Sequence, residues 1–208
     1  MKTYILVYEG FSQFEVILAA HLMKRAGEIV TVGLSTEPIV AHEGFRILPH
    51  TTIERVEAFS VDLFVIPGGD LSKITRRSEL ENLLKAVQSC GGKVGAISSG
   101  TLLLLDAGLA SGRRFASSES IENSATERID QPVVTDGDLV TAQSHGYVDF
   151  ALELGRLNGI YKDETDYEQT LRFFKFFMPA EKSATADAAS IQETSDPFRP
   201  SGAGKARR

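Results

Sequence analysis

The stretch that most constrains the fold of this chain runs from residue 93 to residue 108, where a strand-like segment turns into a helix-like one. Residues 94–97 are apolar and long enough for a buried strand, and residues 101–108 form a leucine-rich helical pattern that ends in glycine. So few residues separate the two segments that the chain must turn sharply at Ser98. The strand and helix backbones nearly touch at such an elbow, so its tip requires small neighbours. The sequence provides them on both sides of the turn: Ala96, Ser99 and Gly100.

An elbow of this kind lifts one side chain clear of the sheet and turns backbone N–H groups toward whatever binds there. In this chain the lifted side chain is Ser98, which makes it a candidate nucleophile. The pattern is small-x-Ser-x-Gly, because Ala96 stands where the strict motif has its first glycine. A simpler interpretation is a strand followed by a pair of serines that cap the next helix. The pattern alone leaves both interpretations open.

The rest of the chain alternates apolar runs typical of buried strands with segments of helical apolar spacing. We expect strands at residues 2–8, 29–34, 61–66 and 94–97, helices at residues 14–25, 79–87, 101–107, 148–157 and 167–178, and hairpins at residues 38–48 and 133–141. The first strand, helix and strand form a βαβ unit, which makes the sheet parallel there. The prediction is an α/β fold, a three-layer sandwich whose flavodoxin-like, mainly parallel sheet carries a nucleophile elbow.

Three local expectations follow from the same patterns. Ser12 precedes the first helix and is its expected N-cap. His21 lies among apolar residues of that helix, so we expect it to pack against the core. Leu171, Phe174 and Phe177 mark the apolar face expected for the last helix.

Composition narrows the classes of partner and the cellular location. The net charge of -6 at pH 7 argues against nucleic acid and anionic membrane surfaces, and no apolar run approaches the roughly 20 residues of a membrane span. Cys90 is the single cysteine and excludes an intramolecular disulfide, and the first residues lack a signal-peptide pattern, so we expect a cytoplasmic protein. The composition changes near residue 179, which predicts one domain over residues 1–178 and a disordered tail over residues 179–208.

Ligands of open α/β sheets bind beyond the carboxyl ends of the strands. Three expected strand ends carry notable residues here: residues 9–10 ahead of the first helix, the Pro-Gly-Gly of residues 67–69, and Ser98. The two glycines are either a plain turn or a source of N–H donors for an anion or oxyanion. The sequence therefore predicts a crevice where these three ends meet.

Four segments follow one another along roughly residues 2–158: Phe14-Glu15 ahead of residues 23–27, Val-Ile-Pro-Gly-Gly at residues 65–69, Gly-Ala-Ile-Ser-Ser-Gly at residues 95–100, and residues 106–113 with the hairpin after them. Together they resemble the ThiJ/PfpI family of the class I glutamine amidotransferase-like superfamily. Each segment is weak evidence alone, but their order and spacing together are typical of the family. The fold that the family implies is the one predicted above.

The resemblance also implies a set of site residues. Family members place a cysteine at the elbow, a glutamate beside it from the first helix, and often a histidine about twenty residues later. In this chain these positions fall on Ser98, Glu15 and a residue at or near Ser118. The glycines after the third strand, Gly68 and Gly69, would direct N–H groups toward the site. The family also implies a homodimer.

Two departures from the family pattern bear on chemistry, because both the thiol and the imidazole are replaced by serine. A serine hydroxyl is un-ionised at neutral pH and needs a neighbouring base before it can attack. Glu15 is one candidate base, and His145, in a loop after the last hairpin, is another; the alternative for His145 is a solvated loop histidine. The N–H groups of Gly69 and Ser99 would form the oxyanion hole. The missing residues argue against a working glutamine amidotransferase.

Three functions remain open at this stage. The first is a non-catalytic or weakly active family member that binds a small metabolite between Glu15 and Ser98. The second is a Ser98-dependent hydrolase or lyase for a small acyl or carbonyl substrate. The third is a stress-response or interaction protein with a vestigial site. In each case we expect no cofactor, and the spacing of the histidines suggests no metal site.

Overall fold

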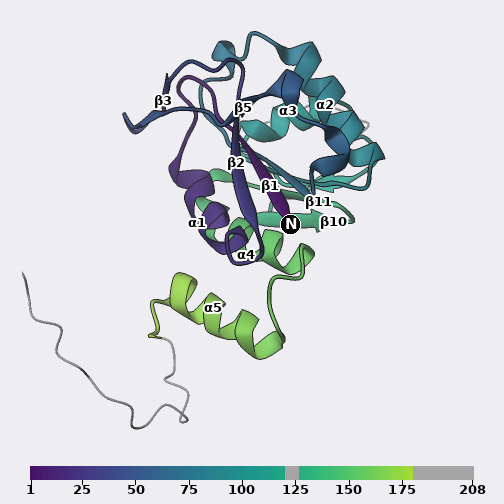
Figure 1. The fold of residues 1–208 in the computed structure, drawn as a ribbon. Helices are drawn as coiled ribbons and strands as arrows, with labels where there is room; N and C mark the ends of the chain where they lie inside the picture. The colour runs from purple at the N-terminus through teal and green to yellow at the C-terminus, as the bar shows by residue number, and fades with distance from the viewer. Residues whose placement is uncertain (120–126, 180–208) are drawn as a thin grey trace, which may run out of the picture.

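The computed structural model describes residues 1–119 and 127–179, in which a mainly parallel sheet lies between two layers of helices (Figure 1). The sheet has seven strands in the order β10-β11-β7-β6-β1-β2-β5. Their bounds are β1 Lys2–Leu6, β2 Glu28–Gly33, β5 Thr51–Thr52, β6 Leu63–Ile66, β7 Lys93–Ile97, β10 Val133–Asp136 and β11 Leu139–Ala142. Strand β10 pairs antiparallel with β11, and the other pairs are parallel. The predicted flavodoxin-like α/β fold is confirmed.

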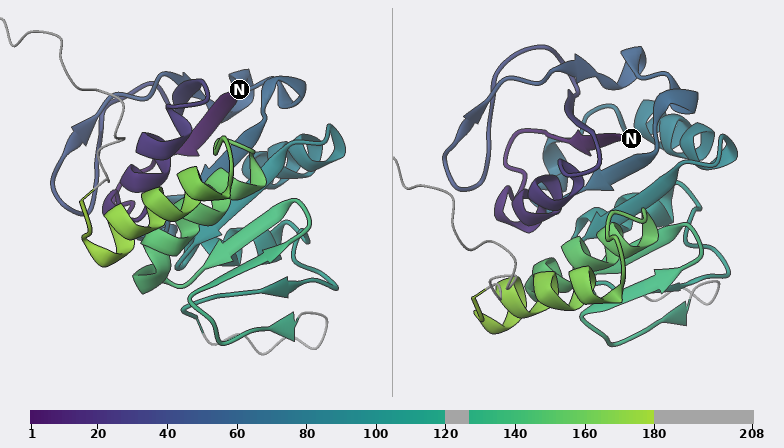
Figure 2. Two further views of the ribbon diagram at one scale, coloured as in Figure 1. Left: turned by 90° about the horizontal axis from the view of Figure 1, so that it is seen from below. Right: turned by 60° about the horizontal axis from the view of Figure 1, so that its bottom comes forward.

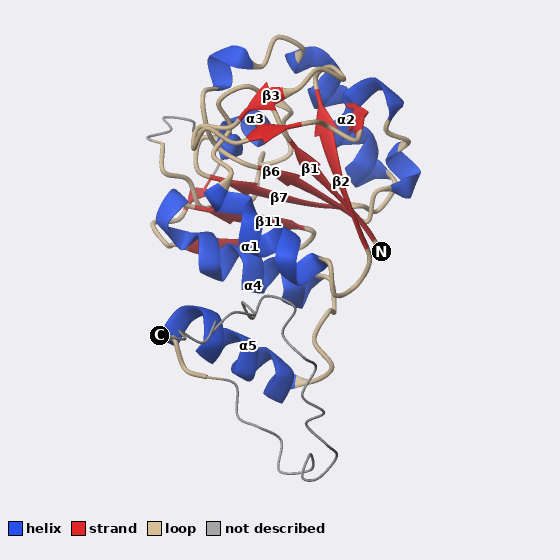
Figure 3. Cartoon of the chain, turned by 60° about the vertical axis from the view of Figure 1, so that its left-hand side comes forward, coloured by secondary structure: helices blue, strands red, loops and turns tan. Residues whose placement is uncertain are grey.

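Helices cover both faces of the sheet. Figure 3 shows α1 (Phe14–Met23) and α4 (Tyr147–Leu157) on one face and α2 (Arg77–Ser89) and α3 (Gly100–Asp106) on the other. A fifth helix, α5 (Glu164–Phe176), packs along the outer side of α4 (Figure 2). None of the described helices is long and apolar enough to span a membrane.

Short elements connect these layers. They are β3 (Ile39–Val40) paired with β4 (Arg46–Ile47), β8 (Arg114–Phe115) paired with β9 (Glu127–Arg128), and the 3₁₀ turns η1 (Ile53–Arg55), η2 (Ala58–Ser60), η3 (Leu71–Lys73) and η4 (Ser144–Gly146). The β3–β4 hairpin is the one predicted at residues 38–48, whereas β5 and the β8–β9 pair have no counterpart in the sequence prediction.

The core lies on both sides of the central strands. All four residues of β6 are buried, as are the last four of β1 and of β7. Strands covered by helices on both faces need apolar side chains at every position rather than at alternate ones. This requirement explains why the continuous apolar runs of the sequence gave the correct strands.

The start of α1 differs from the prediction. Ser12 is not its N-cap: the N–H groups of Gln13 and Phe14 instead donate to the two carboxylate oxygens of Glu43, each at 3.0 Å. Glu43 lies in the loop between β3 and β4, so this cap ties the hairpin to the helix. Two such donors outweigh the effect of burial and lower the pKa of Glu43, which keeps it anionic.

The last helix also differs from the prediction. It begins at Glu164 and ends before Phe177, which adopts a left-handed conformation at φ 56° and is 89% exposed. Leu171 and Phe174 are partly buried against the core, so Phe177 does not share their packed face. Most of the predicted disordered tail, residues 180–208, lies outside the described residues.

Candidate functional site

The turn from β7 into α3 forms the predicted elbow. Ser98 has φ of 57°, a left-handed conformation that costs a non-glycine residue roughly 1–2 kcal/mol. Its N–H still donates to the Ala142 carbonyl at 2.9 Å, and its own carbonyl accepts from the Thr101 hydroxyl at 2.7 Å. These two bonds fix the backbone of Ser98 at the strand end, and its half-buried side chain lies beside Gly68.

The need for small residues beside the elbow is visible at Gly100. A Cβ atom built on this glycine would lie 2.6 Å from the Pro67 carbonyl oxygen and 2.8 Å from that of Ile66. These are backbone atoms at the end of β6 and cannot move cheaply. Glycine therefore allows the elbow and the Pro-Gly-Gly turn to come into contact.

Glu15 projects from the first turn of α1 toward the same glycine, Gly68. Its side chain is buried, with 2% of the residue exposed. One carboxylate oxygen, Oε2, accepts from the Gly68 N–H at 2.7 Å, and the other, Oε1, accepts from the Ser144 hydroxyl at 2.8 Å. Burial raises the pKa of the Glu15 carboxyl, and donors from Ser144, Gly68 and Ser98 oppose this shift without cancelling it.

Gly68 is the point where these groups meet. A Cβ atom on this residue would lie 2.8 Å from Cβ of Ser98, 2.9 Å from its Oγ, and 2.9 Å from Oε2 of Glu15. The glycine therefore leaves the space in which the hydroxyl of Ser98 and the carboxyl of Glu15 approach each other. The structure brings these two sequence-predicted site residues together.

Gly69 and Ser99 form a second pair beside them. The Ser99 hydroxyl accepts from the Gly69 N–H at 3.0 Å and donates to the Gly69 carbonyl at 3.1 Å. The N–H groups of Gly68 and Gly69, both predicted as ligand donors, are thus held by Glu15 and Ser99 respectively in this structure.

Ser118 and His145 lie at the edge of the site. Ser118 is exposed and its hydroxyl accepts from the Ser144 N–H at 2.9 Å, so it reaches Glu15 only through Ser144. The side chain of His145 is exposed on η4, and its ring makes no hydrogen bond to the residues the structure describes.

Sequence reasoning missed two contributors. Ser144 directly contacts Glu15, although the sequence prediction weighed only its neighbour His145. Ser117 is fully buried, and its hydroxyl lies 2.8 Å from that of Thr101, which in turn donates to the Ser98 carbonyl. Ser117, one residue before the predicted Ser118, therefore stabilises the elbow through Thr101. The signal that could have found both is a small hydroxyl residue next in sequence to a predicted site residue: Ser144 precedes His145, and Ser117 precedes Ser118.

The chemistry available at the site is that of hydroxyls, a carboxyl group and backbone amides. Cys90 precedes β7 whereas Ser98 follows it, so the cysteine lies at the opposite end of that strand. Within residues 1–119 and 127–179, no group of three or more His, Cys, Asp or Glu side chains could hold a metal ion. A carboxyl with a raised pKa can donate a hydrogen bond as well as accept one, which suits a carbonyl oxygen.

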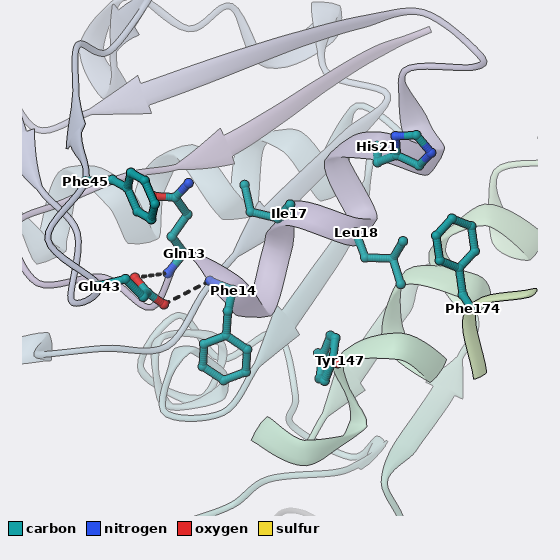
Figure 4. A pocket seen from close by; sticks show the side chains of 9 residues that line it. All are labelled: Gln13, Phe14, Ile17, Leu18, His21, Glu43, Phe45, Tyr147 and Phe174. Carbon is teal, nitrogen blue, oxygen red and sulfur yellow. Dashed lines mark hydrogen bonds between the residues drawn. The ribbon is translucent and has the colours of Figure 1, made fainter. Parts of the chain in front are cut away.

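A separate apolar pocket of about 590 Å³ lies beside the start of α1 (Figure 4). Its wall includes Phe14 and Tyr147, whose rings meet edge to face at 5.7 Å. At its far end His21 contacts Phe174, with ring centroids 5.8 Å apart. His21 is exposed, so the prediction that it packs against the core is wrong.

Comparison with known proteins identifies relatives of this chain. A family model described as the DJ-1/PfpI family matches residues 1–156. Protein dj-1beta of Drosophila melanogaster is 32% identical over 159 residues, 72% of this chain and 85% of that protein. Its crystal structure has a TM-score of 0.69 at 28% identity, covering 82% of this chain and 95% of that one.

Two further relatives have names that state an activity. A glutathione-independent glyoxalase of Caenorhabditis elegans is 29% identical over 152 residues, 70% of this chain and 82% of the relative. A deglycase of Thermococcus kodakarensis is 29% identical over 152 residues, 70% of this chain and 92% of the relative.

Proposed function

This chain belongs to the DJ-1/PfpI family, and from that premise we propose that it binds a small carbonyl compound between Glu15 and Ser98 with little or no turnover. The observation that carries the proposal is the buried carboxyl of Glu15, held by Gly68 and Ser144 beside the Ser98 hydroxyl. The Ser98 hydroxyl can donate to a carbonyl oxygen, and so can the Glu15 carboxyl in its protonated form, which burial favours. The names of two relatives, a glyoxalase and a deglycase, support a carbonyl ligand.

Slow turnover follows from the groups that surround Ser98. A hydroxyl needs a base to become a nucleophile, and the nearby carboxyl is a weak base for an alcohol. Among the described residues, neither an imidazole nor a thiol hydrogen-bonds to Ser98.

The binding proposal can be tested with hydroxyacetone as the probe, followed by two-dimensional amide NMR. We expect saturable shifts at Gly68, Ser98 and Ser144, and a roughly tenfold weaker affinity in Ser98→Ala, which removes one of the two donors to the ligand. Ser111→Ala, an exposed serine in a turn after α3, serves as the control and should bind as the wild type does. The absence of any shift at the site would overturn the proposal and favour a vestigial crevice.

A second candidate, a Ser98-dependent hydrolase or lyase, is favoured by the strained elbow conformation and by the names of the same relatives. Intact-mass labelling with a fluorophosphonate separates the two functions. The binding proposal expects no adduct on wild type after long exposure. A single adduct that Ser98→Ala loses would establish an activated serine, and turnover of small carbonyl and acyl compounds would then be sought.

We further propose that the chain forms a homodimer through the apolar surface around the pocket of Figure 4. Exposed large apolar side chains line this pocket, on α1, α4 and the hairpin loop: Phe14, Ile17, Phe45 and Tyr147. Clusters of this kind mark interaction surfaces more often than isolated residues do.

A charge placed in this surface should dissociate the dimer. Ile17 is 51% exposed, so Ile17→Glu is tolerated by the monomer fold but would bury an unpaired carboxylate in the interface. We expect light scattering after size exclusion to give a dimer for wild type and a monomer for Ile17→Glu. Phe59→Glu is the matched control, because Phe59 is 77% exposed on η2, away from this surface. A monomeric wild type would contradict the proposal.

A further inference from the structure

The backbone N–H of Gly69, one of the predicted ligand donors, already has an acceptor within the protein. The Ser99 hydroxyl occupies it at 3.0 Å and returns its own proton to the Gly69 carbonyl at 3.1 Å. One side chain therefore satisfies both polar groups of the same residue. Gly69 and Ser99 are both half-buried, so each keeps some contact with solvent.

The peptide of Gly69 cannot itself move to meet a ligand. A Cβ atom on Gly69 would lie 2.5 Å from the Gly10 carbonyl oxygen and 2.6 Å from Cα of Phe11, which shows how closely the preceding loop is packed against it. The loop is also bonded to this turn, because the Ser12 N–H donates to the Gly68 carbonyl at 2.9 Å and the Asp70 N–H donates to the Gly10 carbonyl at 3.2 Å. The backbone is fixed, and the Ser99 side chain is the part that can rotate.

We propose that the Ser99 hydroxyl gates the Gly69 N–H, so that a ligand oxygen gains this donor only after Ser99 rotates away. Rotation about one side-chain bond is fast at a partly exposed position. It breaks both bonds to Gly69, so ligand binding in the wild type carries the cost of losing them. The ligand class that this favours is one with a strong oxygen acceptor, a carboxylate or a polarised carbonyl. The inference rests on the proposed function of the crevice and adds a gate to it.

Removing the hydroxyl should therefore improve binding rather than weaken it. In Ser99→Ala the Gly69 N–H is open, and a ligand no longer displaces an internal hydrogen bond. We expect acetate, used as the probe, to bind roughly fivefold more tightly to Ser99→Ala than to wild type, the equivalent of about one net hydrogen bond. The Gly69 amide proton should shift downfield on saturation in the variant. Ser99→Thr retains the hydroxyl and should stay near wild type.

A second measurement needs no ligand. Amide hydrogen exchange at Gly69 should accelerate in Ser99→Ala, while exchange at Gly68, whose N–H is held by Glu15, should be unchanged. Equal exchange at Gly69 in both proteins overturns the gate, as does a Gly69 signal that acetate does not move in any variant. Hydroxyacetone shifts at Gly68 and Ser98 without these effects would overturn the gate and leave the binding function standing.

Discussion

Replacing Gly68 by alanine is expected to destabilise the fold by about 2–3 kcal/mol, the upper part of the range for overpacked sites. The added methyl group would meet Cβ and Oγ of Ser98 and Oε2 of Glu15, all within 2.9 Å. Glu15 cannot withdraw without losing its bond to the Gly68 N–H. Ser98 is held by its backbone at both sides. Urea denaturation of the variant and of wild type measures the loss directly.

The same prediction becomes specific to the site when Ser98 is also changed. Ser98→Gly removes two of the three clashing atoms, so Gly68→Ala should cost at least about 1 kcal/mol less in that background. The single Ser98→Gly change should alter stability by less than about 1 kcal/mol, because relief of the left-handed strain offsets the added chain entropy of glycine.

A glycine outside the site provides the control for this cycle. Gly91 has φ of 83° and open space around its missing Cβ, so Gly91→Ala adds strain without touching Ser98. Its cost should be additive with Ser98→Gly within about 0.5 kcal/mol. If Gly68→Ala costs the same with and without Ser98→Gly, the side chains do not meet over Gly68 as the structure describes.

The sequence predicted the sheet and the elbow well because local patterns determine both. Strands covered on both faces appear as continuous apolar runs. The elbow tolerates only small residues, because a Cβ atom on Gly100 would lie 2.6 Å from the Pro67 carbonyl oxygen. Neither inference needs knowledge of which distant segments meet. Glu15 and Ser98 were named together through the family resemblance rather than through pattern alone.

What the sequence could not predict depends on contacts between distant segments. Glu43 caps α1 from the hairpin loop, and Ser144 binds Glu15 across 129 positions of the chain. A local search for a cap therefore selected Ser12, and the search for bases considered Glu15 and His145 but not Ser144, the hydroxyl that binds Glu15. His21 was assigned to the core because its neighbours are apolar, but helical spacing does not show which residues lie at the boundary of a packed face.

Truncating Glu15 should be the most damaging change in the crevice. Glu15→Ala removes the acceptors of two donors, the Gly68 N–H and the Ser144 hydroxyl, and leaves a buried void. Unsatisfied buried groups and a cavity together cost about 2–4 kcal/mol. Glu15→Gln should cost far less, because its amide oxygen can still accept from Gly68 while its amide nitrogen donates to Ser144. Denaturation at one pH compares the three proteins.

The pH dependence of stability distinguishes a buried charge from a merely polar side chain at this position. Burial raises the pKa of Glu15 above its ordinary value of 4.5, so the folded protein holds this proton more tightly than the unfolded chain does. The stability that comes from the protonated form is fully present below the unfolded pKa and is lost as pH rises through the folded pKa. Glu15→Gln cannot ionise and should not show this loss.

Measured from pH 4 upward in steps of about one unit, the wild type should therefore lose stability relative to Glu15→Gln until a plateau is reached above the folded pKa. Glu37→Gln, an exposed loop substitution, is the control and should track the wild type. A difference between wild type and Glu15→Gln that does not change with pH would show that the crevice stabilises the charged carboxylate as well as water does.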